Sequence, residues 1–148
     1  MSTTSLRRAT PDDHLAVVRL FDAAMLETDA DRLRRQLDAT AGFVLLATIE
    51  ERPVGAVAVD TGPAAVPQLV DGDPARITAI AVRRRRRDSG IGRQLLRAAA
   101  DRVGPRPLTA TFDERVRPFY RACGFEIEPH EGRCWGCRQP SGATLGSE

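Results

Sequence analysis

Residues 76–103 read RITAIAVRRRRRDSGIGRQLLRAAADRV, and this stretch carries the strongest structural signals in a chain of 148 residues. Ile77 to Val82 is an almost uninterrupted apolar run with β-branched residues, which favours a strand buried on both faces of a mixed or parallel sheet. After Gly90 and Gly92, apolar residues recur at helical spacing until Gly104. The stretch therefore predicts a strand, a basic loop, a glycine turn and a helix.

A glycine turn that opens a helix is suited to binding phosphate. The first helical turn offers unpaired N–H groups and the positive end of the helix dipole, and glycine lets a phosphate approach the backbone. Arg87 adds a positive charge beside the turn. The P-loop and Rossmann signatures both fail, because Arg93 follows Gly92 where a P-loop needs lysine, and the third Rossmann glycine is missing. On this segment alone, a turn that binds nothing remains the plainer alternative.

Two motifs in order resemble the GNAT superfamily of N-acetyltransferases. Arg87-x-x-Gly90-x-Gly92 resembles its coenzyme A signature, Gln/Arg-x-x-Gly-x-Gly/Ala. The segment from Tyr120 to Phe125, YRACGF, resembles the later Tyr-x-x-x-Gly-Phe block. Asp113 stands where that block commonly has Asn. The resemblance covers Ile77 to Phe125 and extends more loosely to the N-terminal half.

The resemblance implies direct acetyl transfer from acetyl-CoA to a primary amine of a small molecule or a protein. It also implies Tyr120 as the catalytic general acid toward the departing thiolate, a backbone N–H near Val82 as the oxyanion donor, and no metal. A module of the same fold that senses acyl-CoA without turnover is the alternative. The cofactor-binding residues implied are Ile80, Ala81 and Val82, which pair with the pantetheine arm, and Arg87, Asp88, Ser89, Gly90, Ile91, Gly92, Arg93 and Asp113.

The sequence does not identify a general base. Some family members carry a glutamate early on the central strand, but Arg76 holds that position here. A separate hypothesis is that Arg76 steers an acidic acceptor. The remaining candidates for the base are a water chain, Glu27, Asp60, Asp73 and Glu126.

The general acid faces a cost of its own. For Tyr120, reference pKa values of about 10 for a phenol and about 8.5 for a thiol make proton donation to the thiolate uphill by ~2 kcal/mol unless the site lowers the tyrosine's pKa.

The order of predicted elements indicates an α/β (α+β) fold. We expect a single-domain, GNAT-like mixed sheet, mostly antiparallel with a central splayed parallel pair, and helices on both faces. The domain covers residues 1–139, and residues 140–148 form a frayed tail. Residues 61–74 are expected to form a flap near the acceptor. Predicted helices run from Thr10 to Ala24, Asp29 to Leu37, and from Asp113 toward Gly124; further strands cover residues 6–9, 43–49, 54–59, 107–112, 125–128 and 133–138.

Composition excludes several classes of protein. With 42% hydrophobic and 28% charged residues the chain is globular, and no apolar run approaches a membrane span. The start of the chain lacks a signal-peptide pattern, so we expect a cytoplasmic protein. A net charge of +2 is too balanced to indicate a nucleic-acid partner. The basic run Arg83–Arg87 is typical of a solvated loop and sometimes of a nucleic-acid patch, but the phosphates of coenzyme A explain it equally well, and no aromatic residue is interleaved for base stacking. The expected partner is the amine acceptor, and the resemblance also allows a homodimer.

Three cysteines without a signal peptide indicate reduced thiols. His130, Cys134 and Cys137 leave a third function class open, a zinc or redox protein. Both cysteines fall in a predicted strand, where residues three apart point to opposite faces with Cα atoms ~10 Å apart. Only a turn at Trp135-Gly136 would bring the thiols together.

Overall fold

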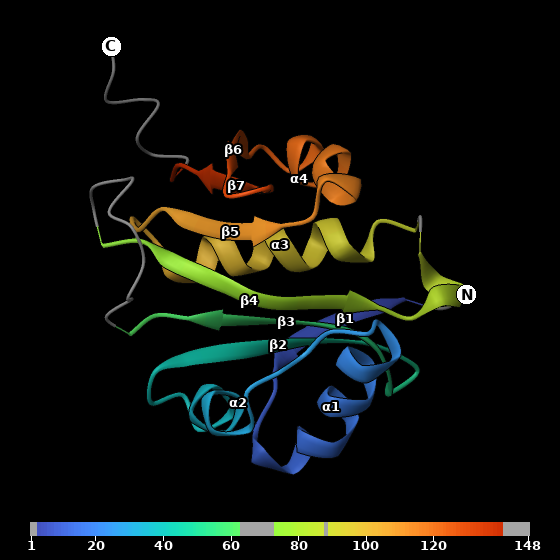
Figure 1. Ribbon diagram of the computed structural model, residues 1–148. Coiled ribbons are helices and arrows are strands. Elements are labelled where there is room, and N and C mark those ends of the chain that lie inside the picture. Colours follow the sequence, from blue (N-terminus) through green and yellow to red (C-terminus); the bar gives the residue numbers. More distant parts are fainter. Residues whose placement is uncertain (1–2, 63–72, 88, 141–148) are drawn as a thin grey trace.

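Seven strands form one mixed sheet in the computed structural model, which describes residues 3–62, 73–87 and 89–140 (Figure 1). The spatial order is β1-β2-β3-β4-β5-β7-β6. Neighbouring strands are antiparallel except β4 and β5, which are parallel. The strands are β1 (Thr4–Arg8), β2 (Gly42–Ile49), β3 (Arg52–Asp60), β4 (Ala75–Val82), β5 (Leu108–Phe112), β6 (Glu126–His130) and β7 (Arg133–Arg138).

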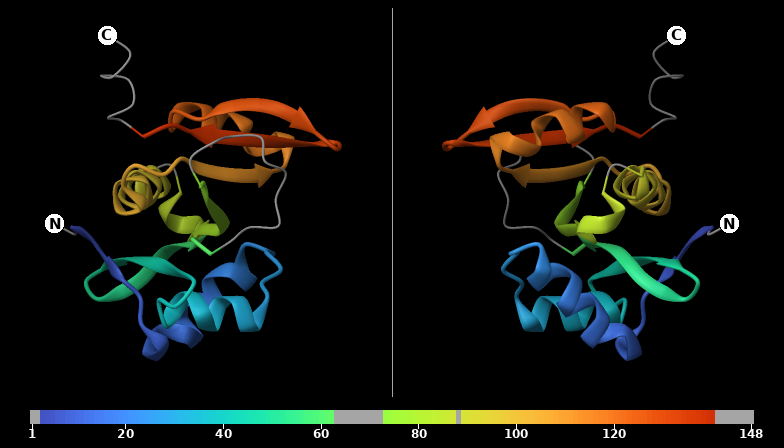
Figure 2. Two further views of the ribbon diagram at one scale, coloured as in Figure 1. Left: turned by 90° about the vertical axis from the view of Figure 1, so that its left-hand side faces the viewer. Right: turned by 90° about the vertical axis from the view of Figure 1, so that its right-hand side faces the viewer.

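The helices lie on both faces of this sheet, as predicted (Figure 2). Asp29 caps the second helix by accepting a hydrogen bond from the Arg32 N–H at 3.0 Å. No helix in the described ranges is both long and apolar enough to cross a membrane. The α-helices are α1 (His14–Ala23), α2 (Ala30–Leu37), α3 (Ile91–Val103) and α4 (Arg117–Ala122), and the 3-10 turns are η1 (Pro11–Asp13), η2 (Arg84–Arg86) and η3 (Glu114–Val116).

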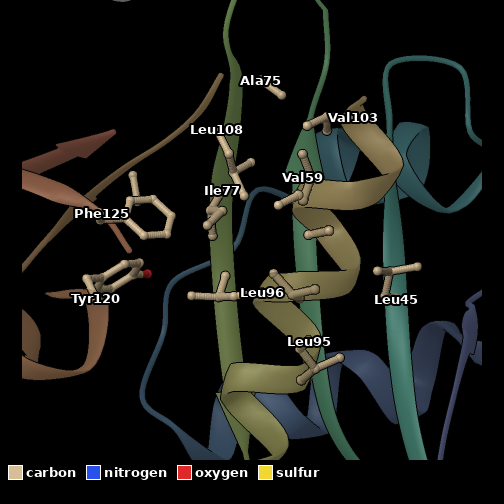
Figure 3. Packing of buried hydrophobic residues seen from close by; sticks show 14 of the residues in the cluster. Leu45, Val59, Ala75, Ile77, Leu95, Leu96, Val103, Leu108, Tyr120 and Phe125 are labelled. Atoms are coloured by element: carbon tan, nitrogen blue, oxygen red, sulfur yellow. The ribbon is translucent and has the colours of Figure 1, made fainter. Parts of the chain in front are cut away.

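Two apolar clusters hold the layers together, one on each face. The first packs α3 and α4 against the sheet, with Leu95 and Leu96 at its centre (Figure 3). The second packs α1 and α2 on the opposite face through Phe21 and Leu37. Full burial of such a side chain contributes about 1.5–3 kcal/mol. The expected mixed sheet, with one parallel pair and helices on both faces, is therefore confirmed.

A β-bulge interrupts the central strand β4 at Thr78. Ala58 of β3 pairs with Ala79, but the next residue of β3, Val59, pairs with Ile77, so Thr78 has no partner across the ladder. Ile77 consequently contributes to the core beside α3, whereas Ala79 contributes to the core beside α1 and α2. The extra residue switches the face on which alternate side chains lie.

The prediction that β4 is buried on both faces is only partly correct. The strand begins at Ala75, two residues earlier than expected, and its residues alternate between buried and half-buried. The reason is the bulge together with the early end of the β5 ladder, which leaves the second half of β4 without a neighbouring strand on one side.

β4 and β5 pair over only two positions before they separate. Ala75 pairs with Leu108 and Arg76 with Thr109, and no later residue of β4 has a partner on β5 (Figure 1). The backbone from Ile77 to Val82 therefore lacks a strand on its β5 side. The predicted splay of the central parallel pair is confirmed.

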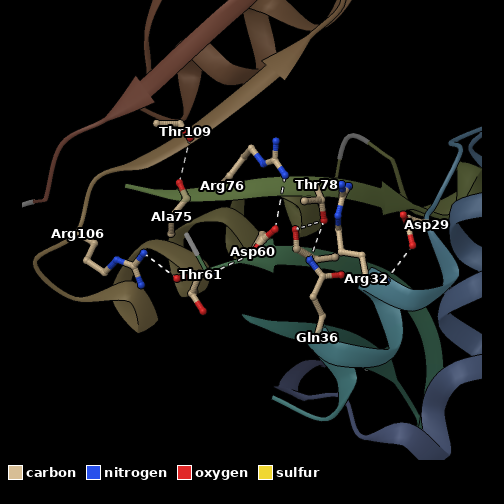
Figure 4. A network of polar contacts seen from close by, with 12 residues as sticks. Asp29, Arg32, Gln36, Asp60, Thr61, Ala75, Arg76, Thr78, Arg106 and Thr109 are labelled. Atoms are coloured by element: carbon tan, nitrogen blue, oxygen red, sulfur yellow. Dashed lines mark hydrogen bonds and ion pairs between the residues drawn. The ribbon is translucent and has the colours of Figure 1, made fainter. Parts of the chain in front are cut away.

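A buried polar link holds the bulge in place. The Gln36 side chain on α2 is 2% exposed, and its Nε2 donates a hydrogen bond to the Thr78 Oγ1 at 3.0 Å (Figure 4). The Thr78 hydroxyl in turn donates to the Ala58 carbonyl at 3.3 Å. Helix α2 is thereby connected to the unpaired residue of β4.

Gln36→Ala is expected to lower the free energy of unfolding by about 2 kcal/mol, because it removes a buried hydrogen bond and leaves a void. Urea denaturation measures the change. The matched control is Gln94→Ala on the exposed face of α3, which should stay within about 0.5 kcal/mol of the parent protein. Equal stability of the two variants would contradict the role of Gln36.

Candidate active site

The opening between β4 and β5 places an unpaired strand edge next to the start of a helix. The predicted cofactor-binding residues Ile80, Ala81 and Val82 all lie beyond the last β4–β5 pair. Ala81 packs into the core beside α1 and α2, and the other two pack against the core beside α3. Their side chains are thus used in packing, and what they offer a ligand is backbone.

The glycine turn starts α3 as predicted. Gly90 is the N-cap and has a left-handed backbone with φ of +87°, a conformation that glycine adopts without strain. The Ser89 hydroxyl donates to the Arg86 carbonyl, closing the turn from the other side. Ile91 is 2% exposed and belongs to the core, so only its N–H can face a ligand. Asp88, also predicted to bind the cofactor, lies outside the described residues.

Gly92 and Arg93 connect α3 to α4. A Cβ on Gly92 would lie 3.1 Å from the Phe119 ring, so glycine allows the close approach of the two helices. The Arg93 Nη2 donates to the Ala122 carbonyl at 3.2 Å. Arg87 also turns toward the protein, because its Nε donates to the Val82 carbonyl at 3.3 Å, over the end of β4.

Tyr120 is enclosed by three phenylalanines. Its ring stacks on Phe112 with centroids 4.0 Å apart, and Phe119 and Phe125 approach edge-on at 5.3 and 5.1 Å. The residue is only 4% exposed, and its hydroxyl points toward β4 across the opening (Figure 3). No partner of this hydroxyl is found in the described part of the chain. The aromatic contacts therefore fix the ring and leave its donor directed at the space between the strands.

Burial raises the pKa of Tyr120 well above its usual value, and the nearby Cys123 adds a smaller effect in the same direction. The charged phenolate is disfavoured in this apolar surrounding. Proton donation to a thiolate would require a lowered tyrosine pKa, and the pKa of Tyr120 is raised instead. The phenol stays protonated and can act as a hydrogen-bond donor.

Asp113 stands at the end of β5 and caps η3. Its carboxylate accepts a hydrogen bond from the Arg115 N–H at 2.9 Å, which matches the predicted cap. This local bond uses one carboxylate oxygen. Nothing in the structure tests the predicted role of Asp113 in binding the cofactor.

The carboxylates considered as general base do not converge on one point. Asp60 lies beside Arg76, with 3.5 Å between the Asp60 Oδ2 and the Arg76 Nη2 (Figure 4). Asp73 pairs with Arg106, also at 3.5 Å. Glu27 and Glu126 are exposed. The register does align Asp60, Arg76, Thr109, Cys137 and Glu126 in one row across the sheet.

The two C-terminal cysteines lie on opposite faces of β7, since the strand runs through Trp135 and Gly136 without a turn. Cys134 is fully buried in the core beside α3 and α4, with its Sγ 3.0 Å from the Glu114 Oε2. Cys137 is in the row with Thr109. All three cysteines are free thiols, and the described residues contain no group of His, Cys, Asp and Glu arranged to hold a metal ion.

Sequence reasoning missed two parts of the site. Phe112, which stacks on Tyr120, looked like an ordinary strand residue. Thr78 interrupts an otherwise apolar run and Gln36 stands between Leu33 and Leu37, and no contact was predicted for either residue. A polar side chain at a core-facing helical position was the one signal that pointed to their bond.

The family comparison agrees with the two motifs. The model of the acetyltransferase (GNAT) family matches residues 11–125. A search of the curated proteins found no match.

Solved structures of similar fold cover nearly the whole chain. A GNAT-family acetyltransferase from Desulfovibrio desulfuricans is 24% identical, with a TM-score of 0.70 over 91% of this chain and 96% of that chain. The N-acetyltransferase YhbS from Escherichia coli, in complex with CoA, is 20% identical, with a TM-score of 0.75 over 98% and 86%. Arabidopsis thaliana Naa50, in complex with a bisubstrate analogue, is 18% identical, with a TM-score of 0.70 over 90% and 96%. At these identities the likeness concerns the fold.

Tyr120 is the only tyrosine, so its ionisation can be followed by tyrosinate absorbance near 295 nm. The folded protein should show no tyrosinate at pH 10.5, whereas the denatured protein should be half-ionised near pH 10. Because the folded pKa is raised, the unfolded state loses its proton first as pH increases above about 10. The free energy of unfolding should then fall, by up to about 1.4 kcal/mol per pH unit.

The chain contains no lysine, so no ammonium side chain titrates over the same pH range. Tyr120→Phe supplies the baseline, since it removes the signal entirely. A native midpoint near 10 would show that the hydroxyl is solvated rather than enclosed.

Proposed function

This chain belongs to the acetyltransferase (GNAT) family, and on that premise we propose that it transfers acetyl from acetyl-CoA directly to a primary amine of a small molecule or a protein. Membership of the family supports acetyl transfer. We propose in addition that the acceptor is a primary amine. The observation that carries it is the opening beside β4, where an unpaired strand edge faces the Tyr120 hydroxyl.

The residues at this opening fit an acyl-CoA. The segment Ile80–Val82 would pair with the amides of the pantetheine arm through the backbone groups on its side away from β3, as one more strand does in β-augmentation. The Val82 carbonyl already accepts a hydrogen bond from Arg87. The N–H groups at the start of α3, from Ile91 to Arg93, would face the pyrophosphate, with Gly90 keeping the approach open. Arg87, Asp88, Ser89, Gly92 and Asp113 complete the proposed contact set. Acetyl-CoA supplies the activated thioester.

Tyr120 serves the leaving group in this proposal. A sulfur that gains negative charge next to the aromatic enclosure has few neighbours that can stabilise it, and the phenol is a donor held in place by three rings. Since its pKa is raised, the hydroxyl stabilises the thiolate by donating a hydrogen bond and keeps its proton. Final protonation of the sulfur then comes from solvent.

The acceptor must lose a proton before it can attack, because an ammonium group is not nucleophilic. Arg76 stands where some family members carry a glutamate, and its charge is balanced by Asp60. A water chain and the four carboxylates remain the candidates for this step. An acidic acceptor steered by Arg76 remains a hypothesis of its own.

Acetyl-CoA is expected to stabilise the protein selectively. At 100 times the dissociation constant, linkage gives ~2.7 kcal/mol, or roughly 5 to 10 °C in a thermal-shift titration. NAD and ATP serve as controls for generic phosphate binding. Thiol release with a panel of amines then tests turnover, and the absence of lysine means that no side-chain amine of the protein itself adds background.

Binding without thiol release from any amine would favour an acyl-CoA sensor over an enzyme. Equal shifts with all three nucleotides would argue against the glycine turn as a coenzyme A site.

Tyr120→Phe is expected to reduce kcat by about 10² while leaving the dissociation constant for acetyl-CoA within about twofold. The loss reflects a missing hydrogen bond to the thiolate, and Phe retains the ring packing. Steady-state thiol release and calorimetric binding measure the two effects. Turnover close to that of the parent protein would remove Tyr120 from the mechanism.

A further inference from the structure

A cavity of about 350 Å³ lies on the β3 side of β4, away from the opening toward β5. None of its described lining residues belongs to β5, α3 or α4. We call it the arginine cavity. It is lined by Ile49, Glu50, Arg52 and Val54 from the β2–β3 hairpin and by Arg83, Arg85 and Arg86 from the loop after β4.

Arg83 joins the two walls of the arginine cavity through one backbone and one side-chain hydrogen bond. The Arg83 N–H donates to the Val54 carbonyl at 2.7 Å, and the Arg83 Nε donates to the Pro53 carbonyl, also at 2.7 Å. The Arg86 N–H donates to the Arg83 carbonyl at 2.8 Å and closes the turn η2. The loop is thus held against the hairpin, so its arginines project from a fixed frame.

The charge of the arginine cavity is strongly positive. Four arginines line it, against the single acidic residue Glu50 among the described lining residues. Across the described ranges, Arg52, Arg85 and Arg86 form no salt bridge. Ile49 and Val54 are core residues beneath the arginines, which are themselves exposed.

We propose that the arginine cavity binds a phosphate monoester carried by a small molecule. The planar fork of arginine matches phosphate oxygens in pairs, which a lysine cannot do. The volume falls at the lower end of small-molecule sites, and none of the described lining residues is aromatic, so they offer no platform for nucleic-acid bases.

The basic run Arg83–Arg87 therefore contributes residues to two separate sites. Arg87 folds over the end of β4 at the acyl-CoA opening, whereas Arg83, Arg85 and Arg86 face the cavity on the other side of the strand. A phosphate monoester has two sources here, the 3′-phosphate of coenzyme A and a separate phosphorylated small molecule. The cavity binds the same chemical group in either case.

The test is a calorimetric titration with inorganic phosphate at constant ionic strength. It is run on the protein alone and on the protein saturated with dephospho-CoA, which carries the pyrophosphate but not the 3′-phosphate. The double variant Arg52→Gln/Arg85→Gln should weaken phosphate binding by about tenfold or more in both series. Arg84→Gln is the matched control, because Arg84 lies in the same loop but does not line the cavity.

Phosphate binding that survives in Arg84→Gln and is lost in the double variant supports the proposal. Equal weakening in both would mean a general effect of positive charge, and it would overturn the proposal. Absence of phosphate binding in the parent protein, in both series, would overturn it as well.

Affinities for coenzyme A and dephospho-CoA identify the source. If the double variant loses the parent's preference for coenzyme A, the 3′-phosphate occupies the arginine cavity. An unchanged preference together with weakened phosphate binding assigns the cavity to a separate phosphorylated small molecule. If neither nucleotide binds, the proposed acetyltransferase function fails, and the titration of the protein alone still decides whether the cavity binds phosphate.

Discussion

The site depends on the separation of two parallel strands. β4 and β5 share only two register pairs, and beyond Arg76 and Thr109 each strand continues without the other. Backbone groups that lack a ladder partner are costly when buried, so such an edge persists only where a ligand or water can satisfy it. The bulge at Thr78 lies just past the point of separation.

The same bulge directs side chains of the central strand into the two cores on opposite faces of the sheet. Ile77 packs under α3, and Ala79 and Ala81 pack toward α1 and α2. The Gln36 side chain fixes the extra residue from the α2 side. A residue just past the point where β4 leaves β5 is therefore tied to the helix α2 on the other face of the sheet.

The surroundings of Tyr120 combine rigidity with weak acidity. Three phenylalanine rings hold the side chain with its hydroxyl toward β4, but the burial that orients it also disfavours ionisation. A residue placed in this way is a better hydrogen-bond donor than a proton donor. The arginines of the basic loop lie on two different sides of β4: Arg87 contacts the Val82 carbonyl, and the others line the arginine cavity.

The sequence by itself determined the family, the element order and the glycine turn. These follow from local rules: an apolar run for β4, helical periodicity for α3, and the glycines Gly90 and Gly92 where that periodicity begins. Tertiary structure alone decided the bulge at Thr78, the bond from Gln36, the aromatic enclosure of Tyr120 and the cavity that joins Arg52 to the loop after β4. Each of these brings together residues that are distant in the chain, and their pairing depends on strand register and solvent exclusion, which local spacing does not encode.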